Sequence, residues 1–378
     1  MRPKALSIGG AAMALALTLS ACGGGSSAGG DTSKAASATS VADLGGMDAL
    51  VAAAKQEGSL HTITLPPDWA NYGEIMKAFE AKYGIKIENE NPDGSSQDEI
   101  NAVKSRKGQS RAPDVLDLGG AFAESGAKEG LFAPYKVASW EQIPADLKDA
   151  TGLFYADYGG FISIGCDAGK VPVCPKTFAD LLKPDYKGKV ALNGNPTKSG
   201  SAFGGLYAAA LGNGGSFDNI QPGIDYFEKL KQAGNFIPVE STPATVEKGE
   251  TPISIDWDYL NAGYAKQFAT KGIKWEVSVP SDGVYANYYN QAINKTAPHP
   301  AAARLWQEFL YSDEGQNLLL KGFTRPIRLP ELVKAGTADK EAVAQLPDVS
   351  SEIKLPTTAQ VDTAKKVLTD NWAKAITG

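Results

Sequence analysis

The sequence has few of the residues on which most enzymes depend. It contains only two histidines, His61 and His299, in 378 residues. It also lacks a nucleophile elbow, a phosphate-binding P-loop, a dinucleotide-binding fingerprint and an HExxH zinc motif. Carboxylates that lie close together in sequence can act as acid and base, but in a chain this rich in Asp and Glu they are mostly surface or cap residues. We therefore expect no enzyme, no cofactor and no metal, with His61 a packed or edge residue of a strand.

The sequence also lacks an excess of basic residues. Lys and Arg number 37 and Asp and Glu 43, so the formal net charge is −6. Proteins that bind nucleic acid usually present a basic face, so no nucleic-acid partner is expected. Beyond the N-terminus, no segment is apolar enough over the roughly 20 residues that a membrane-spanning helix needs.

Cysteine is scarce, with three in the chain: Cys22, Cys166 and Cys174. If Cys22 is lipidated, the other two remain as an even pair in an oxidising compartment, which favours a disulfide that closes a small loop. Two unpaired thiols are the alternative. A metal site is less favoured, because neither histidine lies near the pair in sequence.

The N-terminus has the pattern of a lipoprotein export signal. Arg2 and Lys4 precede an apolar stretch over about residues 6–19, and Leu-Ser-Ala leads into Cys22. A basic start, a short apolar core and small residues before the cut are typical of a secretory signal. We expect a signal peptide over 1–21, a lipidated Cys22 and a flexible Gly/Ala/Ser/Thr-rich linker over 22–45. The protein would then be extracytoplasmic and lipid-anchored, on the periplasmic or cell-surface side of the membrane.

The remaining chain predicts an α/β protein. About 330 residues are large for one hydrophobic core and favour two lobes. Residues 60–65 and 85–88 alternate as strands, and residues 71–83 place their apolar side chains on one helical face, so a parallel strand-helix-strand unit is expected. Further strand-like runs are 114–118, 161–164, 189–192 and 252–255, and helices are expected over 300–321 and 361–375. Such sheets bind ligands beyond the carboxyl ends of their strands.

Several candidate ligand contacts follow the expected strands. Asp68 and Trp69 follow the first strand, where the alternative is a helix cap with a covering ring. Asp117 ends another strand. Thr197, Ser199 and Ser201 precede a run of small residues, where hydroxyls and free amides cradle an anion or simply cap a helix.

The densest group of candidates is Asp256-Trp257-Asp258-Tyr259, directly after an apolar strand. Carboxylates and an indole hold an amine by charge, hydrogen bonds and cation-π attraction. The three side chains converge only if the backbone turns there, since alternate strand residues face opposite sides. Tyr288 joins this set from a second aromatic group, in which core packing is the alternative.

In the order of these segments the chain resembles the substrate-binding proteins of ABC importers, in the family that includes spermidine/putrescine-binding and ferric-ion-binding members. The resemblance covers nearly the whole mature chain. It rests on Cys22, the helix at 71–83, Ala-Pro-Asp-Val at 112–115 before a glycine turn, Asn-Pro-Thr-Lys-Ser-Gly at 195–200, Val-Glu-Lys-Gly-Glu at 246–250, and residues 298–316 with their Ser-Asp-Glu-Gly-Gln ending.

The resemblance implies a type II periplasmic-binding-protein-like fold, in which a solute is held between two hinged lobes and passed to a membrane permease. The boundaries expected from it are 46–159 plus 283–330 for lobe 1, 160–282 for lobe 2 and 331–378 for a C-terminal helical segment. The chain would cross between lobes near 158–160 and 279–284. A monomer with a small-molecule solute and a permease partner is expected.

The resemblance leaves the ligand class open. Ferric-binding relatives present adjacent tyrosines after the strand matched by 252–255, whereas this chain has Asp256-Trp257-Asp258 and a single Tyr259, which disfavours iron. Polyamine-binding relatives use acidic and aromatic residues, so a cationic amine is favoured. A phosphonate, a sugar phosphate and a ferric ion are the alternatives, and an exported hydrolase or a non-transport scaffold is the alternative of a different class.

Overall fold

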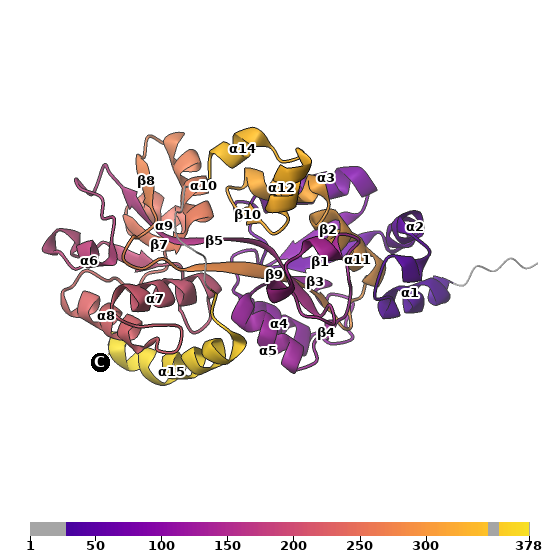
Figure 1. Ribbon diagram of the computed structural model, residues 1–378, viewed down its shortest axis with the longest axis horizontal. Coiled ribbons are helices and arrows are strands. Elements are labelled where there is room, and N and C mark those ends of the chain that lie inside the picture. Colours follow the sequence, from indigo (N-terminus) through magenta and orange to yellow (C-terminus); the bar gives the residue numbers. More distant parts are fainter. Residues whose placement is uncertain (1–27, 347–354, 378) are drawn as a thin grey trace, which may run out of the picture.

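The computed structural model describes residues 28–346 and 355–377, and shows an α/β protein of two lobes placed end to end along its longest axis (Figure 1). The strands are β1 (Ser59–Ile63), β2 (Lys86–Glu90), β3 (Val115–Gly119), β4 (Phe132–Ala133), β5 (Phe154–Asp167), β6 (Val190–Leu192), β7 (Ile253–Trp257), β8 (Trp275–Ser278), β9 (Ala286–Asn294) and β10 (Arg325–Pro326). The main helices are α1 (Ala28–Ser37), α2 (Met47–Glu57), α3 (Tyr72–Tyr83), α4 (Ser96–Ser105), α5 (Gly120–Lys128), α7 (Gly200–Gly212), α8 (Gln221–Gln232), α10 (Asp258–Ala269), α11 (Pro300–Leu310), α12 (Asp313–Lys321) and α15 (Thr358–Thr377). Shorter helices are α6 (Phe178–Leu181), α9 (Pro243–Lys248), α13 (Leu329–Ala335) and α14 (Lys340–Ala344).

The predicted strand-helix-strand unit is confirmed at the start of the first lobe. Strands β1 and β2 pair in parallel and α3 connects them. Helix α3 buries Tyr72, Ile75 and Phe79, which share one helical face. It ends at Gly84, whose φ of 69° is a backbone conformation that glycine adopts without strain.

One long strand, β5, links the two lobes. Its first part pairs antiparallel with β9, from Phe154 to Phe161, with an irregularity between Ala156 and Gly159. From Ile162 to Cys166 it pairs with β7 instead. The lobe boundaries expected from the sequence stay a prediction. The irregularity at Gly159 falls within the expected crossing at 158–160, and the change of partner follows it directly.

The second lobe is built on β6 and β7, which pair in parallel, with α7, α8 and α10 around them. The predicted disulfide is confirmed: Cys166 and Cys174 are bonded and close a loop of sequence separation 8 at the end of β5. Cys166 itself is buried in the core.

The helix expected over 300–321 is two helices, α11 and α12. The break comes at Tyr311 and Ser312, because the Ser312 hydroxyl accepts a hydrogen bond from the Gly315 N–H at 3.1 Å and so caps a new helix. A Cβ at Gly315 would lie 2.2 Å from the Phe309 carbonyl oxygen, so glycine permits the tight join. The amphipathic pattern runs through both helices and hides this cap.

The segment expected to be a flexible linker over 22–45 contains helix α1. Ala35 in this helix is fully buried, and Ala38, just beyond the helix, is nearly so. The Arg304 guanidinium on α11 donates to the Ala36 and Ala38 carbonyl oxygens, each at 2.9 Å. These contacts attach the segment to the first lobe. Cys22 and the expected signal peptide lie outside the described residues.

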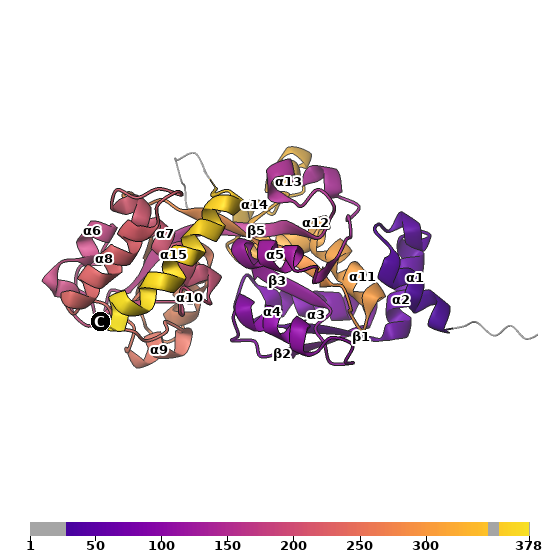
Figure 2. The same ribbon diagram turned by 90° about the horizontal axis from the view of Figure 1, so that it is seen from below.

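Helix α15 lies against both lobes (Figure 2). Trp372 packs edge-on against Phe227 of α8, with ring centroids 5.8 Å apart. Near the other end, the Lys365 ammonium donates to the Ala121 carbonyl oxygen of α5 at 2.7 Å and lies 4.2 Å from the ring centroid of Phe122. Among the helices within 28–346 and 355–377, none combines the length and apolar character that crossing a membrane requires.

Candidate ligand-binding site

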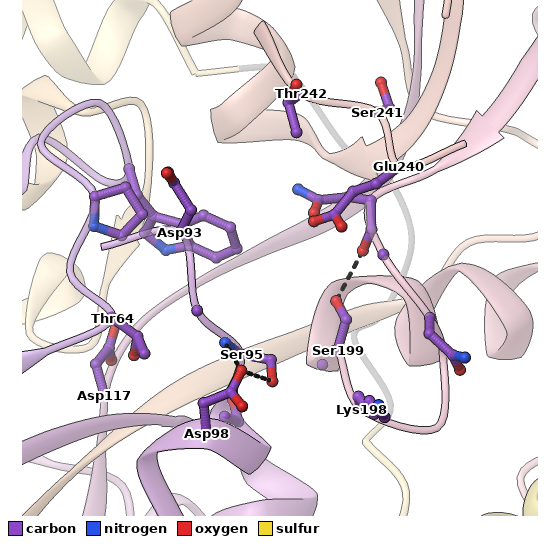
Figure 3. A pocket seen from close by; sticks show the side chains of 18 of the residues that line it. Thr64, Asp93, Ser95, Asp98, Asp117, Lys198, Ser199, Glu240, Ser241 and Thr242 are labelled. Atoms are coloured by element: carbon purple, nitrogen blue, oxygen red, sulfur yellow. Dashed lines mark hydrogen bonds between the residues drawn. The ribbon is translucent and has the colours of Figure 1, made fainter. Parts of the chain in front are cut away.

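A cavity of about 410 Å³ lies between the two lobes (Figure 3). This volume is within the usual range for small-molecule sites. We call it the interlobe cavity. From the first lobe it is lined by Thr64, Pro66, Asp68, Trp69, Asp93, Gly94, Ser95, Ser96, Asp98, Glu99, Asp117 and Tyr289, and from the second by Asn193, Gly194, Asn195, Lys198, Ser199, Gly200, Glu240, Ser241, Thr242, Pro243 and Tyr264.

The first-lobe wall consists mainly of the two loops that follow β1 and β2. Thr64, Ala70 and Asn71 have φ values of 55°, 48° and 67° in the first loop, and Asn91 has a φ of 44° in the second. Left-handed backbone at non-glycine residues costs free energy and gathers at functional loops. The same two loops carry Asp68, Trp69 and Asp93, which line the cavity.

The second-lobe wall consists of the loop before α7 and the loop before α9. Ser199 lines the cavity and also caps α7, since its hydroxyl accepts from the Ala202 N–H at 3.3 Å and donates to the Asn193 carbonyl at 2.8 Å. Thr197 does not line the cavity, and its hydroxyl bonds the Asn195 side chain at 2.8 Å. Ser201 is fully buried beneath the loop.

The interlobe cavity is strongly acidic. Its lining carries one basic side chain, Lys198, against six acidic ones: Asp68, Asp93, Asp98, Glu99, Asp117 and Glu240. Burial raises the pKa of Glu99 well above its ordinary value, which favours its neutral form. Burial, together with the Asp93 charge, raises the pKa of Glu240 and of Asp68. Carboxylates that repel one another at the rim of a cavity are stabilised by a cation that binds between them.

Asp117 lies at the base of the interlobe cavity, where burial raises its pKa to about 7. The Tyr158 hydroxyl donates to Asp117 Oδ2 at 2.7 Å, and the Trp69 indole N–H donates to that same hydroxyl at 2.7 Å. Trp69 also packs edge-on against Tyr289, with centroids 5.5 Å apart. This chain of contacts fixes an aromatic floor beside a carboxylate, an arrangement suited to a cationic group.

Asp256 and Trp257 lie behind the cavity wall. Asp256 is fully buried, accepts hydrogen bonds from the Ser201 hydroxyl and, at 2.7 Å, from the Asn193 amide, and has its pKa raised by burial to about 6. It therefore positions Asn193, which does line the cavity. Trp257 is 2 % exposed and packs on α7, where a Cβ at Gly204 would lie 3.1 Å from its ring.

Helix α10 begins at Asp258 and turns the chain after β7, so Asp258 and Tyr259 do not continue the strand. Asp258 is fully buried and forms an ion pair with Arg325 at 2.7 Å. Tyr259 is buried in a stack with Trp257, with centroids 6.2 Å apart. None of residues 256–259 lines the interlobe cavity, although the Tyr259 and Trp257 rings pack behind its lining residues Trp69 and Tyr289, with centroids 6.0 and 6.3 Å apart.

Tyr288 lies in a different cavity, of about 310 Å³, while its neighbour Tyr289 lines the interlobe cavity. Successive strand residues face opposite sides of a sheet, so only one of the pair on β9 can reach each side. Of the sequence candidates, Asp68, Trp69, Asp117 and Ser199 line the interlobe cavity; Thr197, Ser201, Asp256, Trp257, Asp258, Tyr259 and Tyr288 do not.

Sequence reasoning missed most of the second-lobe wall and one first-lobe loop. The omitted polar side chains include Asp93, Asp98, Asn193, Glu240 and Thr242. Asp93 stands in Asn-Pro-Asp-Gly-Ser directly after β2, so the rule that ligands bind beyond strand ends applied to it as it did to Asp68. Glu240 follows no regular strand, and only the packed structure brings it to the cavity.

Comparison with known proteins identifies the family. The family model described as bacterial extracellular solute-binding protein matches residues 110–349, more than half of the chain. The chain belongs to this family. The resemblance to the substrate-binding proteins of importers is thereby confirmed at the level of family and fold.

Relatives of this solute-binding protein are distant. A Sinorhizobium fredii protein named "Probable ABC transporter periplasmic-binding protein y4fP" is 26% identical over 134 residues, which are 34% of this chain and 37% of that protein's own length. The periplasmic binding protein AfuA of Actinobacillus pleuropneumoniae, solved with fructose-6-phosphate, has a TM-score of 0.67 at 20% identity, covering 84% of this chain and 99% of its own. The ferric binding protein of Campylobacter jejuni has a TM-score of 0.62 at 19% identity, with coverages of 84% and 99%.

Proposed function

We propose that this protein captures a small solute carrying a positive charge in the interlobe cavity and delivers it to the permease of an ABC importer. The observation that carries the ligand class is the excess of acidic over basic side chains, with six acidic residues and one lysine around about 410 Å³. A buried cation needs opposite charges and hydrogen-bond acceptors around it, and Asp68, Asp93 and Asp117 supply both beside the Trp69 ring.

Capture would work by closure of the lobes. Asp93 and Glu240 reach the cavity from opposite walls, so a cation placed between them touches both lobes and favours the closed arrangement by its differential affinity. Strands β5 and β9 pass between the lobes and are the elements that would bend. The expected lipid at Cys22 would keep the protein beside the permease on the outer side of the membrane.

A phosphorylated solute is the second candidate, because two helices begin at the cavity. Ser95 caps α4 and Ser199 caps α7, and both residues line the cavity. Helix N-termini favour anions through their free N–H groups and dipole. The Asp98 carboxylate already occupies the first of these termini, accepting from the Ser95 N–H at 2.9 Å, which weakens this candidate.

Thermal unfolding of the protein from residue 23 onward, with α1 retained because it packs on α11, tests the proposal. The compounds are putrescine, spermidine, 4-aminobutyrate, fructose 6-phosphate, a phosphonate and ferric citrate. At a hundredfold excess over its dissociation constant, a ligand stabilises by about 2.7 kcal/mol. We expect an amine to raise the melting temperature.

The matched control is Asp68→Asn, which removes one cavity charge with little change of shape. It should weaken the binding of an amine and leave unchanged, or strengthen, the binding of a phosphorylated compound. Stabilisation by a phosphorylated compound alone would overturn the cationic ligand and move the contacts to Ser95 and Ser199. Turnover of any of these compounds would favour a hydrolase, and no stabilisation by a wider solute library would favour a scaffold.

A further inference from the structure

The only two histidines of the chain meet in the first lobe, although the sequence separates them widely. His61 is on β1 and His299 immediately precedes α11. Their ring centroids are 4.6 Å apart in an edge-on arrangement. Neither residue lines the interlobe cavity, so the role proposed for that cavity does not account for the pair.

A buried carboxylate, Asp114, holds both histidines by their backbones. Asp114 Oδ2 accepts from the His61 N–H at 2.7 Å, and Oδ1 accepts from the His299 N–H at 2.7 Å. Oδ2 also lies 2.9 Å from His299 Nδ1. Asp114 is fully buried, so this one side chain fixes residues that lie 53 and 185 positions away along the chain. The site is built into the fold before any ligand arrives.

One donor atom each from His61, Asp114 and His299 lie within 4.8 Å of one another, and this is the one such cluster found in residues 28–346 and 355–377. Ligand atoms around a tetrahedral zinc ion, at about 2.0–2.1 Å from it, are about 3.3 Å apart. The two partly exposed rings would rotate on binding to bring their nitrogens to that spacing. A fourth oxygen is near, since Glu88 Oε2 lies 3.4 Å from His61 Nε2.

We propose that His61, Asp114 and His299 bind a divalent transition-metal ion of the zinc class, with the Glu88 carboxylate or water as the fourth ligand. Two imidazoles with carboxylate oxygens are a donor set suited to zinc, copper or nickel and poorly suited to calcium or magnesium. The charge balance agrees, because Asp114 and Glu88 adjoin two imidazoles that are neutral when they bind metal. The imidazole rings are 17% and 19% exposed, so an ion reaches them from solvent.

The ion would brace β1 against the start of α11. The neighbouring Glu57 on α2 accepts from the N–H groups of Ala301 and Ala302 at 3.1 and 2.8 Å, so three elements meet at this point. Metal binding that requires the folded site is also free energy of folding, so the bound ion stabilises the first lobe.

The test uses untagged protein, freed of metal with a chelator, and zinc chloride alone as the probe. Because the chain has two histidines, its NMR spectrum holds two imidazole Cε1–H signals. Both should shift with one equivalent of zinc and broaden strongly with cobalt. Calorimetry should give one zinc ion per chain at this site, and the melting temperature should rise.

The variants His61→Gln and His299→Gln should each weaken zinc binding by more than about 100-fold, because loss of even an outer-shell partner costs about 10- to 100-fold. Asp68→Asn is the matched control: it removes a carboxylate from the acidic interlobe cavity and should leave zinc affinity within about twofold. The NMR test needs no variant, so misfolding of a variant does not leave the question open. Imidazole signals that do not move with zinc, or zinc binding lost in Asp68→Asn and kept in His61→Gln, would overturn the proposal.

Discussion

Replacing Asp258 by Asn separates a structural carboxylate from a ligand-binding one. Asp258 is fully buried, and its Oδ2 lies 2.7 Å from Arg325 Nη1. Its Oδ1 accepts from the Phe161 and Tyr259 N–H groups at 2.9 and 3.0 Å. Asparagine keeps an oxygen for these N–H groups but turns an amide donor toward the guanidinium, so Arg325 loses its buried anion.

The expected loss is about 3 kcal/mol of unfolding free energy. Breaking a buried ion pair on one side costs about 3–5 kcal/mol. The lower end applies here, because Arg325 is 16% exposed and its guanidinium carbon lies 4.7 Å from the centroid of the Phe161 ring. Affinity for the stabilising amine should stay within about twofold, because Asp258 does not line the interlobe cavity.

Urea unfolding followed by tryptophan fluorescence measures the unfolding free energy, and calorimetric titration measures the amine affinity. The Asp68→Asn protein should give the opposite result, with nearly unchanged stability and weakened amine binding. In the double variant Asp258→Asn/Arg325→Met, part of the lost stability should return, since Arg325→Met removes the charge that Asp258→Asn leaves uncompensated. If the Asp258→Asn protein keeps wild-type stability and loses amine affinity, this account is refuted and Asp258 is a ligand contact.

Four further outcomes are expected. Amine affinity should fall as pH drops below about 7, by up to about tenfold per pH unit, because Asp117 with its raised pKa becomes neutral there. Asp117→Asn should flatten this profile. A flat profile of the wild-type protein would exclude Asp117 from the site. The pH dependence of folding stability has the opposite sign. Because the pKa of Asp117 is raised in the folded protein, the unfolding free energy should decline as pH rises from about 4 to 7. Replacing Cys166 and Cys174 by Ala should lower the unfolding free energy by about 2–3 kcal/mol through the freed loop of separation 8, and an unchanged urea midpoint would contradict this. Trp372→Ala should lower the unfolding free energy by about 3 kcal/mol and speed amide hydrogen exchange along α15, because the indole packs on Phe227. Amides that stay protected in the variant would show that other contacts hold the helix.

The local pattern of residues was sufficient to predict some helices of the fold and insufficient for others. The period of apolar residues over 71–83, with Gly84 after them, is enough to predict α3 and its end, because side-chain spacing and glycine conformation act within a few residues. It was insufficient where two helices share one apolar face, as at Ser312, because a cap inside an amphipathic pattern leaves the pattern intact. Composition also concealed helix α1, because the Ala36 carbonyl oxygen of this small-residue helix is bound by Arg304 from a distant part of the chain.

The sequence by itself indicated the α/β class, the family, a disulfide and two cavity residues near the carboxyl ends of strands, Asp68 in the loop after β1 and Asp117 within β3. Only the tertiary structure decided which carboxylates face the interlobe cavity. Asp256 and Asp258 stand in the richest motif of the chain, yet one bonds Asn193 and the other pairs with Arg325, while Asp93 and Glu240 come from unremarked loops to opposite walls. The physical reason is that a side chain's direction depends on the turn of the backbone and on partners far away in sequence, neither of which is visible in the local order of residues.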